Sequence, residues 1–110
     1  MNRPAFIRAA ITAVETMPIP RVGNAELATM PPMAVSVGRT EVIVQRSASR
    51  ASWVVGLQRH FDGEPKICTM LVDWEPGKPV VDQARIADDF HIMLDGIEEA
   101  AGMEIPHPAR

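Results

Sequence analysis

Tyrosine is absent from the sequence, and cysteine occurs once, at Cys68. A single cysteine excludes an intramolecular disulfide, and it cannot supply the several thiolates of a cysteine-based zinc site. The lack of tyrosine removes one common general acid from the side chains available for catalysis. The single cysteine and the absence of tyrosine together limit the kinds of active site that the chain can form.

Long hydrophobic runs are also missing, since none approaches the roughly 18 apolar residues that a membrane-spanning helix needs. Residues 1–20 are apolar in character but are interrupted by Arg8 and Glu15, unlike the continuous apolar centre of a signal peptide. The single cysteine fits a reducing compartment. We therefore expect a soluble protein, intracellular or particle-borne, with no membrane partner and no recognisable secretion signal.

The composition is that of one globular domain, with 110 residues of which 46% are hydrophobic and 23% charged. The net charge of −3 is unevenly distributed. Residues 1–66 carry eight Lys or Arg and five acids, whereas residues 67–110 carry three and nine. This asymmetry favours contact within the chain or head-to-tail contact between copies over direct binding of nucleic acid, which we do not expect.

Apolar residues at helical spacing predict two amphipathic helices, one near each end of the chain. The first covers residues 1–17 and has Asn2 as its N-terminal cap. Residues 18–32 contain four prolines and predict an irregular crossing loop without regular structure. The second helix covers residues 80–102, and Gly96 inside it suggests a point where another backbone passes close by.

The segment between the two helices predicts a β-meander over residues 33–74. β-Branched and alternating apolar residues mark four strand candidates, at residues 33–37, 41–46, 53–61 and 67–74. The joints between them are short and rich in turn-forming residues, which favours antiparallel neighbours. The joint "DGEP" at residues 62–65 begins with an Asp-Gly pair, a strong hairpin signal.

This order of elements predicts an α+β fold, a four-stranded antiparallel meander sheet with N-terminal and C-terminal helices packed on one face. The whole chain forms one domain, and residues 103–110 form an extended tail. The opposite face of the sheet retains Ile43, Val54 and Leu71, which is more apolar surface than a lone monomer usually leaves in water. This face is therefore a candidate surface for contact with another protein.

Candidate catalytic motifs are missing from the chain. The glycines are scattered, so no phosphate-binding loop is present, and the serines lack a nucleophile-elbow context. Cys68 alternates with core residues in a strand, which indicates a buried and inert thiol. We expect no catalytic residues and no cofactor, and hence a protein that is not an enzyme.

Asp88, His91 and Asp95 in the second helix are spaced at i, i+3 and i+7, so the three side chains share one side of it. Carboxylates and imidazole at this spacing can chelate a divalent metal ion. The alternative, a solvated acidic face, is favoured because the first helix offers only Glu15 as a further ligand. We therefore predict no metal site, with these three residues as the candidates if one exists.

Three arginines lie in or beside the polar linker between the second and third strand candidates, namely Arg46, Arg50 and Arg59. A nucleic-acid-binding finger would need aromatic side chains for base stacking, and Trp53 is the only one nearby. The simplest interpretation is a polar hairpin loop with surface arginines. If these arginines bind anything, we expect them to bind protein.

Ile92 projects from the second helix on the side opposite the apolar stripe, among carboxylates. It is either a stray surface residue or the centre of a subunit contact. We predict that the acidic side of this helix faces the arginines of a neighbouring copy. The candidate interface residues are Arg46, Arg50, Arg59, Asp88, Ile92 and Asp95.

Four segments carry a resemblance to a known family: the helix "RAAITAVE", the strand "PPMAVSV", the meander that follows it, and the acidic helix "ARIADDFHIMLDGIEEA". Their order resembles that of small neck and tail-completion proteins of tailed bacteriophages, tail terminators in particular. The resemblance implies a subunit of a ring that caps a growing tail tube. It also implies that no catalytic residues are present.

The functional hypothesis is a non-catalytic structural or assembly subunit. It works through protein–protein contacts in a homo-oligomeric ring or particle, such as a phage tail or neck component. Its partners would be further copies of the same chain and other protein subunits. One alternative is a small acidic inhibitor or regulatory protein that binds a host complex, with its acidic helix as a mimic of nucleic-acid charge. Another is a small metal-dependent enzyme that uses Asp88, His91 and Asp95.

Overall fold

The computed structural model describes residues 2–48 and 52–102. The extended tail expected at residues 103–110 lies outside these described residues. The described part contains three helices and four strands. In chain order they are α1 (Arg3–Glu15), α2 (Asn24–Thr29), β1 (Met33–Val37), β2 (Thr40–Arg46), β3 (Trp53–Phe61), β4 (Glu64–Val72) and α3 (Gln83–Ala100).

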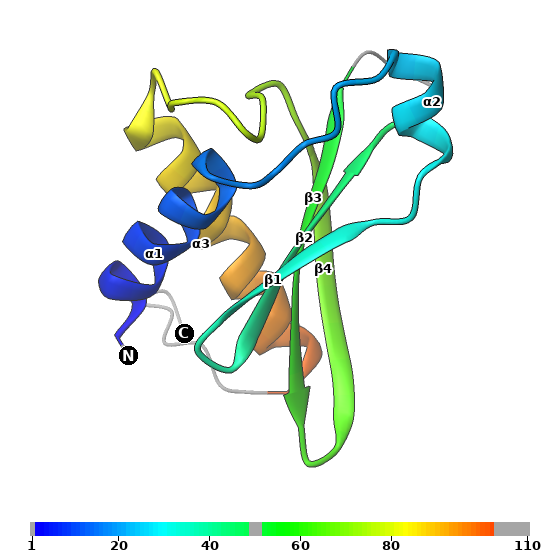
Figure 1. The fold of residues 1–110 in the computed structure, drawn as a ribbon. Helices are drawn as coiled ribbons and strands as arrows, with labels where there is room; N and C mark the ends of the chain where they lie inside the picture. Colours follow the sequence, from blue (N-terminus) through cyan, green and yellow to red (C-terminus); the bar gives the residue numbers. More distant parts are fainter. Residues whose placement is uncertain (1, 49–51, 103–110) are drawn as a thin grey trace.

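The four strands form one sheet in the order β1-β2-β3-β4, and every neighbouring pair is antiparallel. Figure 1 shows α1 and α3 on the same side of this sheet. Helix α3 packs on β3 and β4, whereas α1 packs on α3 and on β1. The predicted α+β fold, an antiparallel meander with N-terminal and C-terminal helices on one face, is therefore confirmed.

The two outer hairpins turn through pairs of residues whose backbones suit the twist of the strands. Between β3 and β4, Asp62 and Gly63 have φ values of 51° and 83°. Positive φ at both positions defines the tight hairpin turn for which Asp-Gly is the preferred pair, as predicted. Gly38 has a φ of 60° in the two-residue turn between β1 and β2.

Strand β4 begins earlier than the sequence predicts, because the joint expected at residues 62–65 consists of only two turn residues. Pro65 lies inside β4 and pairs with His60 of β3. A proline is tolerated there because β4 is an edge strand, so its missing N–H removes no hydrogen bond from the sheet. The strand also ends at Val72, short of the predicted residue 74.

Both long helices begin at side-chain caps. The Asn2 side chain accepts a hydrogen bond of 2.9 Å from the backbone N–H of Ala5, which confirms the predicted cap of α1. Asp82 caps α3 in the same way, with the backbone N–H of Arg85 as donor at 3.1 Å. Helix α3 is therefore shorter at its start than the predicted range of 80–102.

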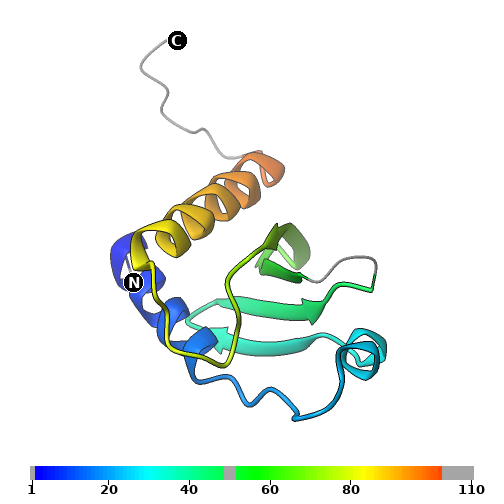
Figure 2. The same cartoon turned by 90° about the horizontal axis from the view of Figure 1, so that it is seen from above.

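The crossing at residues 18–32 is not entirely irregular, which corrects the sequence-based expectation. It contains α2, a six-residue helix whose Leu27 is buried in the core. Ten proline-free residues separate Pro20 from Pro31, which leaves room for this helix of nearly two turns. Figure 2 shows α2 at the far end of the molecule from α1.

The core fills the space between the two long helices and the face of the sheet that they cover. It draws on the apolar stripe of each helix and on alternate residues of the strands. Its largest fully buried side chains are those of Phe90, Leu57, Met93, Ile97, Val14, Val42, Val44 and Val55.

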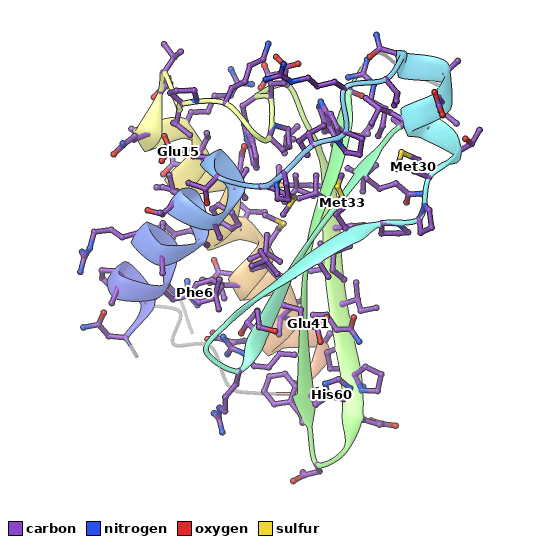
Figure 3. The ribbon with its side chains drawn as sticks, viewed as in Figure 1. Phe6, Glu15, Met30, Met33, Glu41 and His60 are labelled. Carbon is purple, nitrogen blue, oxygen red and sulfur yellow. The ribbon has the colours of Figure 1, made fainter. Side chains whose placement is uncertain are left out.

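The connection between β4 and α3 is hydrogen-bonded to the C-terminal end of α1. Glu15, which Figure 3 labels, accepts a hydrogen bond of 2.7 Å from the backbone N–H of Val80. The backbone N–H of Gly77 donates to the carbonyl oxygen of Val14 at 2.8 Å. These two bonds position the start of α3 beside the end of α1.

Helix α3 approaches β4 closely at Gly96. A Cβ atom on this glycine would lie 2.6 Å from Sγ of Cys68. The neighbour is therefore a side chain, and not the backbone that the sequence suggested. Because Gly96 has no side chain, α3 packs directly against the thiol of Cys68 in β4.

Candidate interaction surfaces

The sheet has one face that neither α1 nor α3 covers, and we call it the outer face. Strand alternation and the pairing registers assign its side chains. They are Ala34, Ser36, Glu41, Ile43, Gln45, Val54, Gly56, Gln58, His60, Pro65, Ile67, Thr69 and Leu71.

Apolar side chains occupy the β4 side of this outer face. Ile67 is 54% exposed and Leu71 is 46% exposed, which is unusual for large aliphatic residues. Val54 and Ile43 of the inner strands are half-buried beside them. The sequence indicated three of these four residues, and the alternation of β4 with Leu71 would also have indicated Ile67.

Polar side chains lie on the same face toward the β3–β4 turn. Glu41 and His60 are labelled there in Figure 3, on the lower half of the sheet. His60 pairs in register with Pro65, and Glu41 pairs with Gln58. Ile67 pairs in register with Gln58, so the polar side chains of β2 and β3 adjoin the apolar side chains of β4.

The arginines of the β2–β3 linker do not form one basic cluster. The guanidinium carbon of Arg46 lies 5.5 Å from the ring centroid of Trp53, within the range of a cation–π contact. Trp53 itself is only 4% exposed, so its ring is not available for base stacking. Arg50 lies outside the described residues.

Arg59 lies at the opposite end of β3 from this hairpin tip. It lies six positions beyond Trp53, which is about 20 Å along a strand. Arg59 projects from the helix-covered face, where its Nε donates a 2.7 Å hydrogen bond to Oγ1 of Thr40. It therefore belongs to a different surface from Arg46.

The acidic side of α3 is partly neutralised within the chain. Arg3 of α1 forms ion pairs with Asp95 at 2.8 Å and with Glu98 at 3.0 Å. Partial burial by itself lowers the pKa of Arg3, but its bonds to these carboxylates outweigh that effect and raise the pKa. Asp88 and Ile92 are exposed one helical turn apart, and Ile92 is 58% exposed.

The structure does not bring the metal candidates of α3 together as a site. Within residues 2–48 and 52–102, no group of three His, Cys, Asp or Glu side chains could hold a metal ion. Asp88 and His91 are exposed, and Asp95 is engaged by Arg3. This arrangement fits a solvated acidic face.

Cys68 is half-buried where β4 meets α3. Burial raises the pKa of its thiol above the ordinary value. A raised pKa keeps the group protonated at neutral pH, and the thiol is a much poorer nucleophile than the thiolate.

A cavity of about 390 Å³ lies beside the β4–α3 connection, where Trp74 and Ile86 line its apolar part. Its two basic groups are paired with carboxylates of the same lining. Arg85 binds Asp73 at 2.8 Å, and a further ion pair joins Lys78 to Glu75. This cavity therefore offers no unpaired positive charge to an anionic ligand.

Comparison with known proteins gives no match to a protein-family model, to a curated protein or to a solved structure. Among the described residues, no helix is long and apolar enough to cross a membrane.

Proposed function

We propose that this protein is a non-catalytic assembly subunit that associates with further copies of itself in a homo-oligomeric ring or particle, such as a phage tail or neck. The observation that carries the proposal is the exposed apolar side of the outer face along β4. Ile67 and Leu71 are exposed there, and Leu71 pairs in register with the half-buried Val54. Association would remove this apolar area from water, at a gain of roughly 25 cal/mol per Å².

A second exposed apolar residue favours a head-to-tail arrangement. Ile92 lies on the solvent side of α3, and α3 packs on the inner face of the sheet. The outer face and the Ile92 surface are therefore on opposite sides of the molecule. A ring requires two different complementary surfaces on each subunit, and these two surfaces meet that requirement.

The experiment is sedimentation velocity at micromolar concentration on four proteins: wild type, Leu71→Lys, Ile92→Lys and Val22→Lys. Val22 is exposed in the crossing and lies on neither surface, so its variant is the matched control. We expect assemblies larger than the 12.0 kDa chain for wild type and Val22→Lys, and monomers for the other two.

An equimolar mixture of Leu71→Lys and Ile92→Lys separates the possible geometries. Each variant keeps one intact surface, so head-to-tail contact predicts that the mixture forms dimers while neither variant does alone. Electron micrographs of the wild-type assembly would then show closed rings. A monomeric wild-type protein at micromolar concentration and moderate salt would refute the proposal.

A further inference from the structure

A second cavity, distinct from the outer face, lies between the β1–β2 turn, β3 and the start of α1. Its volume is about 310 Å³. It is lined by Phe6, Val37, Gly38, Arg39, Thr40 and Arg59. Figure 3 labels Phe6, which α1 contributes between itself and the sheet. The cavity therefore combines an apolar wall with two guanidinium groups.

The orientation of Arg59 in this cavity is fixed by one hydrogen bond. Its Nε donates to Oγ1 of Thr40, and Thr40 is only 1% exposed. A guanidinium group has five N–H donors in a planar fork, so this bond leaves four of them for other acceptors. No carboxylate in the described part of the chain lies within 4 Å of Arg59, unlike Arg3, Arg85, Lys66 and Lys78.

A second positive charge lies close to the first. Arg39 is exposed in the β1–β2 turn and immediately precedes Thr40, the residue that pairs with Arg59. Desolvation lowers the pKa of Arg59, and the charge of Arg39 lowers it further. The half-buried guanidinium group of Arg59 therefore lies beside a like charge, and a bound anion would offset the repulsion between the two arginines.

Glu98 is close enough for its charge to act on Arg59, but it is already engaged. A smaller cavity of about 130 Å³ also borders Arg59 and includes Arg3 and Glu98 in its lining. The Glu98 carboxylate binds Arg3 at 3.0 Å, and Arg3 also binds Asp95. The carboxylates of Glu98 and Asp95 are thus both paired with Arg3, and neither forms an ion pair with Arg59 or Arg39.

We propose that this cavity binds an oxyanion, a phosphate or carboxylate group, between the guanidinium groups of Arg59 and Arg39. The planar fork of arginine matches the paired oxygens of such groups and binds them through charge-assisted hydrogen bonds. The anion could belong to a small molecule or to an acidic side chain of another protein molecule. The argument for this site does not rest on the self-association proposed above, since neither arginine lies on the outer face or on the Ile92 surface.

The test is a titration with inorganic phosphate at constant ionic strength, followed by NMR through the Nε–H of the arginines and the backbone amides of Gly38 and Arg39. Wild type should show saturable shifts at these groups. Arg59→Gln should bind phosphate at least tenfold more weakly. Arg8→Gln removes the same charge from an exposed position of α1 and should bind like wild type.

Arg39→Gln is a second variant that separates lost binding from misfolding, because this side chain is exposed in a turn and makes no described hydrogen bond. It too should weaken phosphate binding. Non-saturable shifts, or equal affinity in wild type and both cavity variants, would overturn the proposal. Sedimentation with and without phosphate then identifies the source of the anion. Dissociation of the assembly by phosphate points to a carboxylate of another copy, and an unchanged assembly points to a small molecule.

Discussion

The packing of α3 on β4 predicts an unusual response to replacing Gly96 by alanine. Gly96 has an ordinary helical backbone, so alanine there should favour the helix by about 1 kcal/mol. However, the added Cβ would lie 2.6 Å from Sγ of Cys68, and one of the two must move. Overpacking of this kind costs about 1–3 kcal/mol. We therefore expect Gly96→Ala to lower the free energy of unfolding by up to about 2 kcal/mol.

The sign of this effect should reverse when the thiol is removed. In a Cys68→Ala background Sγ is gone, and Cβ of residue 68 lies 3.5 Å from the new Cβ, an ordinary van der Waals distance. Only the helix-favouring effect of the Gly96→Ala change then remains. It should raise the free energy of unfolding by about 1 kcal/mol relative to Cys68→Ala alone.

Urea denaturation followed by circular dichroism on the four proteins of this double-mutant cycle measures both effects. All four should be studied at one protein concentration, because self-association would add a concentration-dependent contribution to stability. We expect an interaction energy of about 1–3 kcal/mol between the two sites. If Gly96→Ala had the same effect in both backgrounds to within about 0.5 kcal/mol, the close approach of α3 to the thiol would not control this packing.

The other predictions concern the β3–β4 turn, the hydrogen-bonded connection between β4 and α3, and the thiol of Cys68. Gly63→Ala should lower the free energy of unfolding by about 1–2 kcal/mol, because φ is 83° there, and Gly63→Asn should cost less in the same urea titration. Glu15→Ala should cost about 1–2 kcal/mol through its lost bond to the N–H of Val80, whereas Glu15→Gln keeps an acceptor and should cost less. Because burial raises the pKa of Cys68, iodoacetamide should label the native thiol more slowly at pH 8.5 than the urea-unfolded one. The same raised pKa disfavours the thiolate in the fold, so stability should fall as pH rises past the ordinary thiol pKa near 9.0, and Cys68→Ala should lack that part of the fall.

The elements that the sequence predicted well are those with local signals. Asn2 caps its own helix, and the Asp-Gly pair turns its own hairpin, so neither depends on distant residues. The errors arose where tertiary structure decides. Pro65 indicated a turn by its type, but it is accepted in β4 because β4 has a neighbour on one side only. Helix α2 is too short to show a periodic pattern and is anchored by burial of Leu27.

The surfaces could be predicted only in part for the same reason. Ile43, Val54 and Leu71 follow from strand alternation and were assigned to the uncovered face correctly. The basic surface was not assigned correctly, because closeness in sequence grouped Arg59 with Arg46, although Arg46 ends β2 and Arg59 pairs with Thr40 at the start of β2. The cavity around Arg59 draws on α1, the β1–β2 turn and β3, so it becomes visible only once the pairing register is known.

Part of the charge asymmetry along the sequence is neutralised within one molecule. Arg3 comes from the positive part, Asp95 and Glu98 come from the negative part, and their ion pairs lie inside one molecule. If copies associate as proposed, that pairing leaves the apolar outer face as the main source of affinity between them. Exposed ion pairs weaken as salt rises, whereas burial of apolar area does not. We therefore expect the dissociation constant, measured by sedimentation equilibrium, to change less than about threefold between 0.05 and 0.5 M NaCl. A tenfold or larger weakening would show that charges between copies hold the assembly together.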